Sequence, residues 1–291
     1  MSQNPTGPHQ PSACDRTGAR LDRLEPIMEV RERSAQPVKE VLMVPADELQ
    51  VVMSAGWPGL EQRRLGDWLL RAGEGYTQRA NSALVVGDPG LALDEALAVV
   101  TRFYAERGLP ARLQVPFPYP VPHDPAPGVD TELAGLGSTA SGLTEVMVAP
   151  VTGLDLPDPP DGLHLTFSEH PSRDWMASRD RSSVALRVLT AAPAHYLEAR
   201  LGDELVGIGR VCCSGGWAGL SAIEVVPEHR RRGYGRAVTA ALARYGAELG
   251  AHSLYLQVEH GNPAALLYRQ LGLTGHHAYH YRVLPGERSF M

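Results

Sequence analysis

Four arginines and two glycines stand close together in the second half of the chain, in a pattern suited to binding an anion. They belong to the segment Ala222–Arg236, AIEVVPEHRRRGYGR, which an alanine-rich run of helical period follows. The first turn of a helix has unpaired N–H groups, and its dipole favours negative charge. Glycine lets the backbone approach a ligand closely, and arginine presents forked donors that suit phosphate oxygens. The segment therefore predicts a pyrophosphate cradle.

The spacing distinguishes between kinds of cradle. A Walker loop needs Lys-Ser/Thr after its second glycine, which is absent, and a dinucleotide fingerprint needs a third glycine where Val238 stands. The remaining pattern is V-x-P followed by R-x-x-G-x-G, made by Val225, Pro227, Arg230, Gly233 and Gly235. It resembles the acetyl-CoA loop of the GNAT superfamily of acyl-CoA N-acyltransferases. The alternative is a solvated basic turn before a helix.

A second motif strengthens this resemblance. N-x-x-A-x-x-L-Y-x-x-x-G-L runs from Asn262 through Tyr268 to Gly272 and is similar to the second GNAT signature. The resemblance covers residues 163–285. It implies that Tyr268 lies near the thioester sulfur and Asn262 near the pantetheine or the splayed strands.

The same resemblance assigns the cofactor contacts. It implies that the pantetheine arm lies along the fourth strand of the unit and that the arginine loop surrounds the pyrophosphate, with Arg230 opening the motif. The expected cofactor-binding residues are Ile223, Glu224, Val225, Arg230, Arg231, Arg232, Gly233, Tyr234, Gly235, Arg236, Asn262 and Tyr268.

Acetyl transfer to an amine requires a neutral amine, a donor to the oxyanion and a proton for the leaving thiolate. The resemblance implies that Tyr268 is the candidate acid and that a main-chain N–H near Val225 donates to the oxyanion. The alternative is that Tyr268 is a structural residue of the core. Glu224 is the favoured base. Glu259, His260 or a chain of water molecules stay open as alternatives, because the position of a glutamate in some GNAT enzymes is here Gln257.

Composition limits the other functions. The chain has 291 residues, of which 43% are hydrophobic, and a formal net charge of −6, which argues against nucleic acid as the main partner. Cys14, Cys212 and Cys213 form no disulfide framework, and no apolar run is long enough to span a membrane. We expect a cytoplasmic protein that needs no membrane, and whether it forms a homodimer is open.

An internal repeat predicts the architecture. Arg102, Ala105, Glu106 and Gly108 recur at the same spacing as Arg244, Ala247, Glu248 and Gly250, and each set leads into Leu-Gln-Val. Leu136-Gly137 then matches Leu271-Gly272. The predicted fold is α/β, with two GNAT-like domains in tandem, each a mixed, mostly antiparallel twisted sheet flanked by helices. The predicted bounds are a disordered or loosely docked arm (1–44), a degenerate first domain (45–148), a Pro/Asp-rich linker (149–162) and a catalytic domain (163–291).

The first copy lacks the residues of the cradle. Its counterpart of Tyr268 is Leu133, so its expected role is to cover the catalytic sheet and to wall the acceptor cleft. Segments 66–73 and 79–87 are predicted as a hairpin with its turn near Gly75, and the proline-rich segment 116–128 is predicted to be no central strand. This hairpin carries a polar-aromatic cluster whose side chains are expected to satisfy one another's hydrogen-bonding groups. The alternative is that they contact the acceptor substrate. The members of the cluster are Trp68, Arg71, Arg79, Asn81 and Ser82.

Three histidines near the end of the chain are not expected to bind a metal. The neighbours His276 and His277 would point to opposite faces of an extended strand, and His280 lacks a completing ligand set.

The resulting hypothesis is an N-acetyltransferase that moves the acetyl group of acetyl-CoA to a primary amine by direct attack in a ternary complex, without a metal. The alternative is a non-catalytic acetyl-CoA sensor. Gln257 favours this alternative, because it stands where some GNAT enzymes have a glutamate base, whereas the presence of the candidate acid Tyr268 argues against it. The acceptor is a small molecule or a protein amine, and the acidic balance of the chain slightly favours a cationic one.

Overall fold

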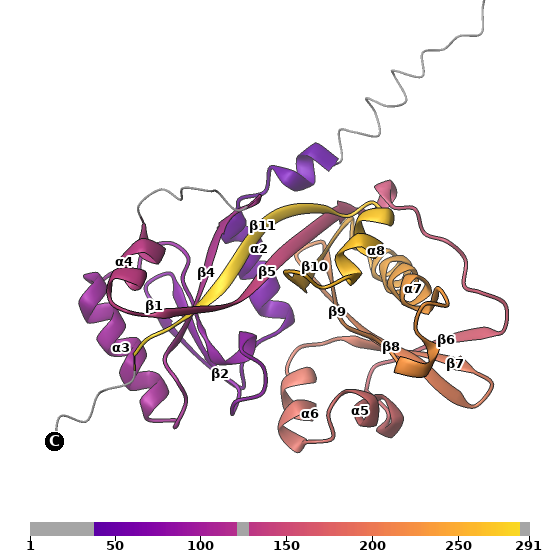
Figure 1. Ribbon diagram of the computed structural model, residues 1–291, viewed down its shortest axis with the longest axis horizontal. Helices are drawn as coiled ribbons and strands as arrows, with labels where there is room; N and C mark the ends of the chain where they lie inside the picture. Colours follow the sequence, from indigo (N-terminus) through magenta and orange to yellow (C-terminus); the bar gives the residue numbers. More distant parts are fainter. Residues whose placement is uncertain (1–37, 121–127, 286–291) are drawn as a thin grey trace, which may run out of the picture.

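The computed structural model describes residues 38–120 and 128–285, and in them the strands form one continuous sheet. The sheet has eleven strands in the order β1-β2-β3-β4-β11-β5-β10-β9-β8-β7-β6 (Figure 1). The strands are β1 (Glu61–Leu65), β2 (Trp68–Ala72), β3 (Ala83–Leu84), β4 (Arg112–Pro118), β5 (Thr139–Pro150), β6 (Leu163–Ser168), β7 (His195–Leu201), β8 (Glu204–Ser214), β9 (Trp217–Val225), β10 (Ser253–Glu259) and β11 (Thr274–Val283). The predicted arm lies mostly outside the described residues, as does part of the proline-rich segment.

Helices cover both faces of this sheet. They are α2 (Ala46–Gly56), α3 (Leu93–Ala105), α4 (Val129–Gly135), α5 (Arg173–Arg179), α6 (Ser183–Leu189), α7 (Tyr234–Glu248) and α8 (Ala264–Gln270), with short 3-10 turns η1 (Arg79–Asn81), η2 (Val151–Gly153) and η3 (Pro227–His229). In the described part of the chain, no helix is long and apolar enough to cross a bilayer. The predicted α/β class with a mixed, mostly antiparallel sheet is confirmed.

The last strands of the two halves are exchanged between them. β11, from the end of the chain, lies between β4 and β5, whereas β5, from the first half, lies between β11 and β10 (Figure 1). Along β5, Met147 and Ala149 enter the core beneath α7, and the alternate residues Val146 and Val148 enter the core beneath α2. Each half of the sheet is therefore completed by a strand of the other half.

The register of these strands follows the repeat in the sequence. Gln114 of β4 pairs with Tyr281, and its counterpart Gln257 of β10 pairs with Val146. Val146 and Tyr281 each lie nine residues after the matched glycines Gly137 and Gly272. The two halves are thus related by a pseudo-twofold arrangement, which local sequence similarity alone does not reveal.

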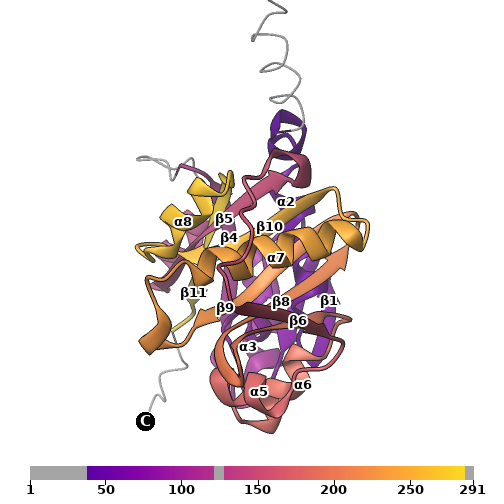
Figure 2. The same cartoon turned by 90° about the vertical axis from the view of Figure 1, so that its right-hand side faces the viewer.

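α7 crosses one face of the second half of the sheet, over β8 and β9 (Figure 2). Its core-facing side is rich in alanine, which brings the helix close to the strands; a Cβ added at Gly246 would lie 2.6 Å from the Cβ of Ala218. This close packing holds the N-terminus of α7 at a fixed place beside the end of β9.

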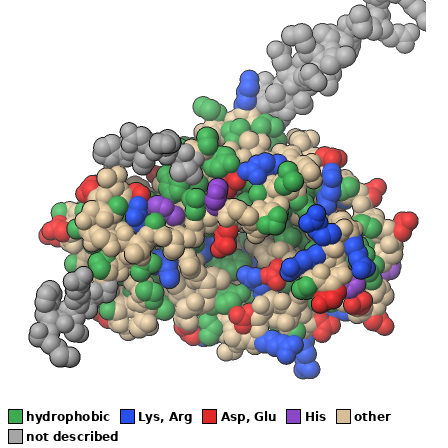
Figure 3. Space-filling view, viewed as in Figure 1, with side chains coloured by type: hydrophobic (Ala, Val, Ile, Leu, Met, Phe, Trp, Pro, Cys, Tyr) green, Lys and Arg blue, Asp and Glu red, His purple; other side chains and the backbone are tan. Residues whose placement is uncertain are grey.

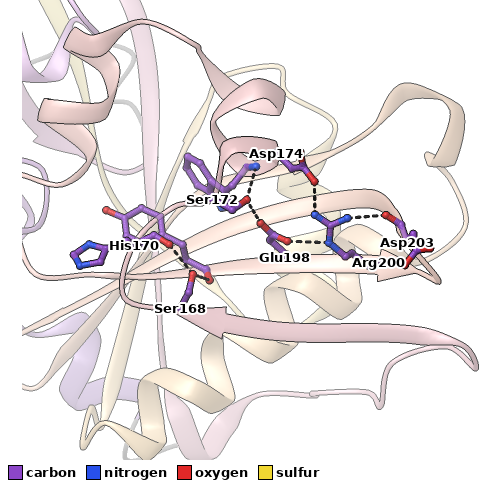
Figure 4. A network of polar contacts seen from close by, with 9 residues as sticks. Ser168, His170, Ser172, Asp174, Glu198, Arg200 and Asp203 are labelled. Atoms are coloured by element: carbon purple, nitrogen blue, oxygen red, sulfur yellow. Dashed lines mark hydrogen bonds and ion pairs between the residues drawn. The ribbon is translucent and has the colours of Figure 1, made fainter.

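α5 is fixed at the far edge of the sheet by a network of polar contacts (Figure 4). Ser172 caps α5 by accepting a hydrogen bond from the Trp175 N–H and donates its own hydrogen to Glu198 on β7. Arg200 joins Glu198 to Asp174 of α5, with distances of 2.9 and 2.7 Å. The helix that these contacts hold carries Arg179 at its C-terminal end.

Two details of the first half differ from the prediction. β2 pairs with β3 as expected, but the tight hairpin joins β2 to β1, whose polar sequence EQRRL gave no strand signal. β4 also continues through Pro116 to Pro118 and lies inside the sheet between β3 and β11. Residues 116–118 therefore form a strand, which the proline content did not suggest, but they pair with β11 alone, because the short β3 pairs only with Leu113 and Gln114 and leaves their other edge open to the prolines.

Candidate active site

A cleft opens where two parallel strands in the second half separate. β9 and β10 pair from Trp217–Ser253 to Leu220–Leu256, and beyond these residues they diverge. The cleft between them has a volume of about 520 Å³ and is lined on its two sides by residues 220–224 of β9 and residues 256–259 of β10. Figure 3 shows a hollow near the middle of this face, with basic side chains gathered toward α7 and α8.

A bulge in β9 helps to open the cleft. The register between β8 and β9 shifts between Ile208 and Arg210, and Ala222 takes the left-handed conformation with φ of 50°. Such a conformation is strained for a residue with a Cβ and occurs mainly where the fold imposes it. Beyond the bulge, the carbonyl of Val225 accepts a hydrogen bond from Arg230 Nε at 3.0 Å, so the backbone of Val225 turns away from β8. Its N–H points to the same side, because both groups of a strand residue share one direction.

The arginine loop joins the end of β9 to α7. Gly233 is the N-cap residue with φ of 85°, a conformation that glycine adopts at no steric cost, and the space beside it is open. No side chain caps the helix, so its first N–H groups are available to a ligand. Arg231, with φ of 64°, and Arg232 are exposed beside this turn.

The other two arginines of the loop are engaged by the protein. Arg230 bonds to the Val225 carbonyl, as above. Arg236 pairs with Asp155 of the connecting segment, with 2.6 Å between Nη2 and Oδ2. Of the four basic side chains predicted to contact the diphosphate, Arg231 and Arg232 are therefore the best placed.

Tyr268 reaches the cleft from α8. It is 8% exposed and lines the cleft together with Asn262, whose Oδ1 accepts a hydrogen bond from the Ala264 N–H at the start of α8. Burial raises the pKa of Tyr268 to about 12, so its hydroxyl is protonated at neutral pH and can act as a donor. Its counterpart Leu133 is fully buried in the core of the first half.

Glu224 lines the opposite side of the cleft and is paired with a cation. Its Oε1 forms an ion pair with Nη1 of Arg179, which the anchored helix α5 presents from the far side. Glu259 also lines the cleft, at the exposed end of β10, and His260 follows it outside the lining. Both carboxylates considered as bases thus adjoin the cleft, and Glu224 is the one held in a defined position.

The first half of the chain supplies the remaining wall. Trp57, Thr77, Gln78, Arg79 and Thr144 line the cleft, and β11 adds two more aromatic residues. The hydroxyl of one of these, Tyr279, donates a hydrogen bond of 2.8 Å to Oε1 of Gln257, the residue that replaces the glutamate.

Sequence reasoning missed several of these residues. Arg179, Trp57, Tyr279 and Tyr281 carry no local motif, and only the exchange of strands brings β11 to the cleft. The repeat was the one signal that could have pointed to β11.

Most of the predicted polar-aromatic cluster is structural. Arg71 is buried and donates to Ser82 and to Gln114, while Asn81 accepts from the N–H groups of Gly73 and Gly75. Trp68 belongs to the core of the first half. Arg79 differs from the other members because it faces the cleft.

The expected orientation of the histidine pair was wrong. A bulge between Gly275 and His277 turns the two rings toward one another, with 2.7 Å between their Nδ1 atoms. Gln50 donates to His277 Nε2 at 2.8 Å, and His276 Nε2 donates to the Val44 carbonyl at 2.9 Å. Because each ring then donates once and accepts once, both histidines are neutral. No group of metal-binding residues occurs in the described ranges, and His280 instead pairs with Asp130 at 2.5 Å.

Comparison with known proteins gives a consistent result. Residues 47–282 match the family model described as "Probable histone acetyltransferase Rv0428c C-terminal". The chain is 31% identical over 246 residues to the probable histone acetyltransferase Rv0428c of Mycobacterium tuberculosis, a match that covers 82% of this chain and 73% of that protein. It is 27% identical over 249 residues to the uncharacterized N-acetyltransferase YobR of Bacillus subtilis, with 81% and 97% covered.

Solved structures agree on the fold. A GCN5-related N-acetyltransferase from Kribbella flavida superposes with a TM-score of 0.65 at 18% identity, covering 84% of this chain and 97% of that one. A tandem GNAT protein from the clavulanic acid biosynthesis pathway superposes with a TM-score of 0.54 at 17% identity, covering 69% and 74%. The second of these supports the tandem arrangement.

Proposed function

Because this chain belongs to the Rv0428c C-terminal acetyltransferase family of the GNAT superfamily, we propose that it moves the acetyl group of acetyl-CoA to a primary amine. The transfer occurs by direct attack in a ternary complex. The observation that carries the proposal is the position of Tyr268 and Glu224 on opposite sides of one cleft, with the arginine loop beside the end of β9.

The geometry supports the cofactor contacts that the family resemblance implies. The open N-terminus of α7 and the side chains of Arg231 and Arg232 would hold the diphosphate, since main-chain N–H groups and guanidinium groups both bind phosphate oxygens. The bulged stretch of β9 from Ala222 to Val225 would lie along the pantetheine arm, because its edge is not paired with β10.

Chemistry then takes place at the thioester. The amine nitrogen attacks the carbonyl carbon, and the N–H near Val225 is the proposed donor to the oxyanion. The C–S bond breaks with its electron pair passing to sulfur, while the nitrogen loses a proton to Glu224 directly or through water. These steps leave an acetylated amine, CoA as its thiolate and a protonated Glu224.

Tyr268 is the proposed donor to the departing sulfur. An ordinary thiol has a pKa of about 8.5, so full proton transfer from a phenol of pKa about 12 is uphill by roughly 5 kcal/mol. Tyr268 therefore acts chiefly by hydrogen bonding to sulfur as negative charge develops there. As the products separate, the thiolate takes up through water the proton that Glu224 accepted from the amine, which returns Glu224 to its carboxylate form.

Turnover of acetyl-CoA with a panel of primary amines tests this function. Released CoA is measured with a thiol reagent and the acetylated amine is identified by mass spectrometry. Amine-dependent release with a matching acetylated product supports the enzyme. Tight binding of acetyl-CoA without turnover on any amine favours the non-catalytic sensor instead.

A further inference from the structure

Arg79 forms part of the cleft wall opposite the proposed acetyl-CoA loop. It begins the 3-10 turn η1, is half-buried, and lines the cleft with Tyr279 and Tyr281 of β11. Its Cζ lies 5.2 Å from the centre of the Trp57 ring, and the indole N–H of Trp57 is fixed by a 3.1 Å bond to Thr77 Oγ1. The guanidinium is thus held against an aromatic wall.

The charge of Arg79 has no acidic partner among the described residues. Two carboxylates line the cleft; Glu224 is paired with Arg179, and Glu259 lies at the exposed end of β10. Within the described ranges Nε of Arg79 is buried without a hydrogen-bond acceptor. A buried charged donor without a partner is unfavourable, so an acceptor that enters the cleft gains a strong interaction there.

Other arginines behind the same wall add positive potential. Arg210 is fully buried with its Cζ 5.3 Å from the Trp57 ring centre, and its acceptors are neutral, the carbonyls of Leu189 and Gly56 and the hydroxyl of Ser221. Arg71 is buried on neutral oxygens as well. Because no carboxylate of the described chain cancels these charges at the wall, their field extends into the cleft.

Burial lowers the pKa of Arg79, but the oxygens of Tyr279 and Tyr281 raise it by more, so the guanidinium keeps its full charge. The Tyr279 hydroxyl already donates its hydrogen to Gln257, so of the two tyrosines it is Tyr281, which also lines the cleft, that is left for a second contact to a bound anion.

We propose that the acceptor is a small primary amine that also carries a carboxylate, with the carboxylate bound by Arg79 and the amine directed toward Glu224. This inference rests on the proposed acetyl transfer and specifies its substrate class. It runs opposite to the net charge of the chain, which alone favours a cationic acceptor. The local positive charge of the cleft wall determines which acceptor binds, because charges within the cleft act at short range and in a lower dielectric than charges on the distant surface.

Binding of matched acids and amides to the CoA-saturated protein tests the proposal without requiring turnover. The probes are linear ω-amino acids from glycine to 6-aminohexanoate, each with its own amide, measured by calorimetry. At least one acid is expected to bind about 10-fold or more tightly than its amide, the worth of a charge-assisted hydrogen bond. Arg79→Gln is expected to abolish that preference and Arg79→Lys to restore part of it, with the affinity for CoA unchanged in both.

Equal binding of every acid and its amide overturns the proposal, as does an acid preference that survives Arg79→Gln. Arg63→Gln, at an exposed position on the outer strand β1, is the matched control and leaves the preference intact. Acid-selective binding without any acetylated product would refute the proposed enzyme while keeping the anion site. Acetylation of the amides as readily as the acids would support the proposed enzyme and refute the anion site at Arg79.

Discussion

Thr144 and Tyr279 face one another across β5 and β11, and they hold equivalent positions in the two halves of the chain. Thr144 lies seven residues after Gly137, and Tyr279 lies seven residues after the matched Gly272. The pseudo-twofold relation between the halves therefore passes through this pair. Both side chains line the cleft, so the site is built at the seam between the halves.

This exchange of strands makes the second half depend on the first. Without β5, the strand β10 would expose an unpaired edge and Met147 would leave the core beneath α7. Residues 163–291 expressed alone are therefore expected to be insoluble or unfolded by circular dichroism. Co-expression with residues 1–153 should restore a soluble complex. A stable fragment 163–291 that binds acetyl-CoA would contradict the dependence.

Tyr268→Phe removes the proposed donor to sulfur and little else, because the ring remains buried. We expect kcat to fall by about 10²-fold, the usual cost of removing one hydrogen-bond donor to a charge that develops in the transition state, with the Kd for acetyl-CoA nearly unchanged. Tyr245→Phe, on a tyrosine that stacks on Phe167, is the control and should leave kcat intact. Equal rates in wild type and Tyr268→Phe would remove Tyr268 from the mechanism.

Glu224→Gln tests the base. The substitution keeps the size of the side chain but removes both proton acceptance and the ion pair with Arg179. We expect kcat/KM to fall by about 10²-fold, and the loss should shrink as the pH rises and more of the amine is neutral. Glu259→Gln makes the same change at the other carboxylate that lines the cleft, and it is expected to lower kcat/KM less than Glu224→Gln does. A larger loss in Glu259→Gln than in Glu224→Gln would transfer the role to Glu259.

The buried histidine pair should make the fold sensitive to acid. Burial, with a smaller effect of His276, lowers the pKa of His277 to about 3, below the ordinary value of about 6.5. The unfolded chain then takes up a proton that the folded chain does not, so stability falls as the pH decreases below about 6.5. The expected loss is about 2 kcal/mol between about pH 6 and pH 4.

Urea unfolding of wild type and His277→Asn at several pH values measures this effect. The variant should be less stable at pH 7, because Gln50 and His276 lose a partner, yet should lose less stability on acidification. His252→Asn, at an exposed histidine, serves as the control. An identical pH dependence in wild type and His277→Asn would show that His277 does not govern acid sensitivity.

Local sequence patterns predicted much of the fold. The alanine-rich run that follows the arginine loop forms α7, and segments 66–73 and 79–87 contain the paired strands β2 and β3, because each of these segments carries its own periodicity. Tyr268 and Glu224 line the cleft as their motifs implied, and their chemical roles stay predictions. So does the cytoplasmic location.

What local patterns could not predict depends on long-range pairing. β1 is an edge strand with a polar sequence, so it shows no hydrophobic alternation. The rings of His276 and His277 meet because of a bulge that pairing with β5 imposes. Arg179 and Tyr279 reach the cleft from an anchored helix and an exchanged strand, and neither position carries a motif.

The central claim is that the loop before α7 binds the diphosphate of acetyl-CoA. Calorimetric titration of acetyl-CoA into wild type, the double variant Arg231→Glu/Arg232→Glu and Arg236→Gln tests it most directly. We predict one site in wild type, loss of at least about 100-fold in affinity in the double variant, and a smaller loss in Arg236→Gln, whose arginine is engaged by Asp155. Absence of binding in wild type, or equal affinity in wild type and the double variant, would contradict the account.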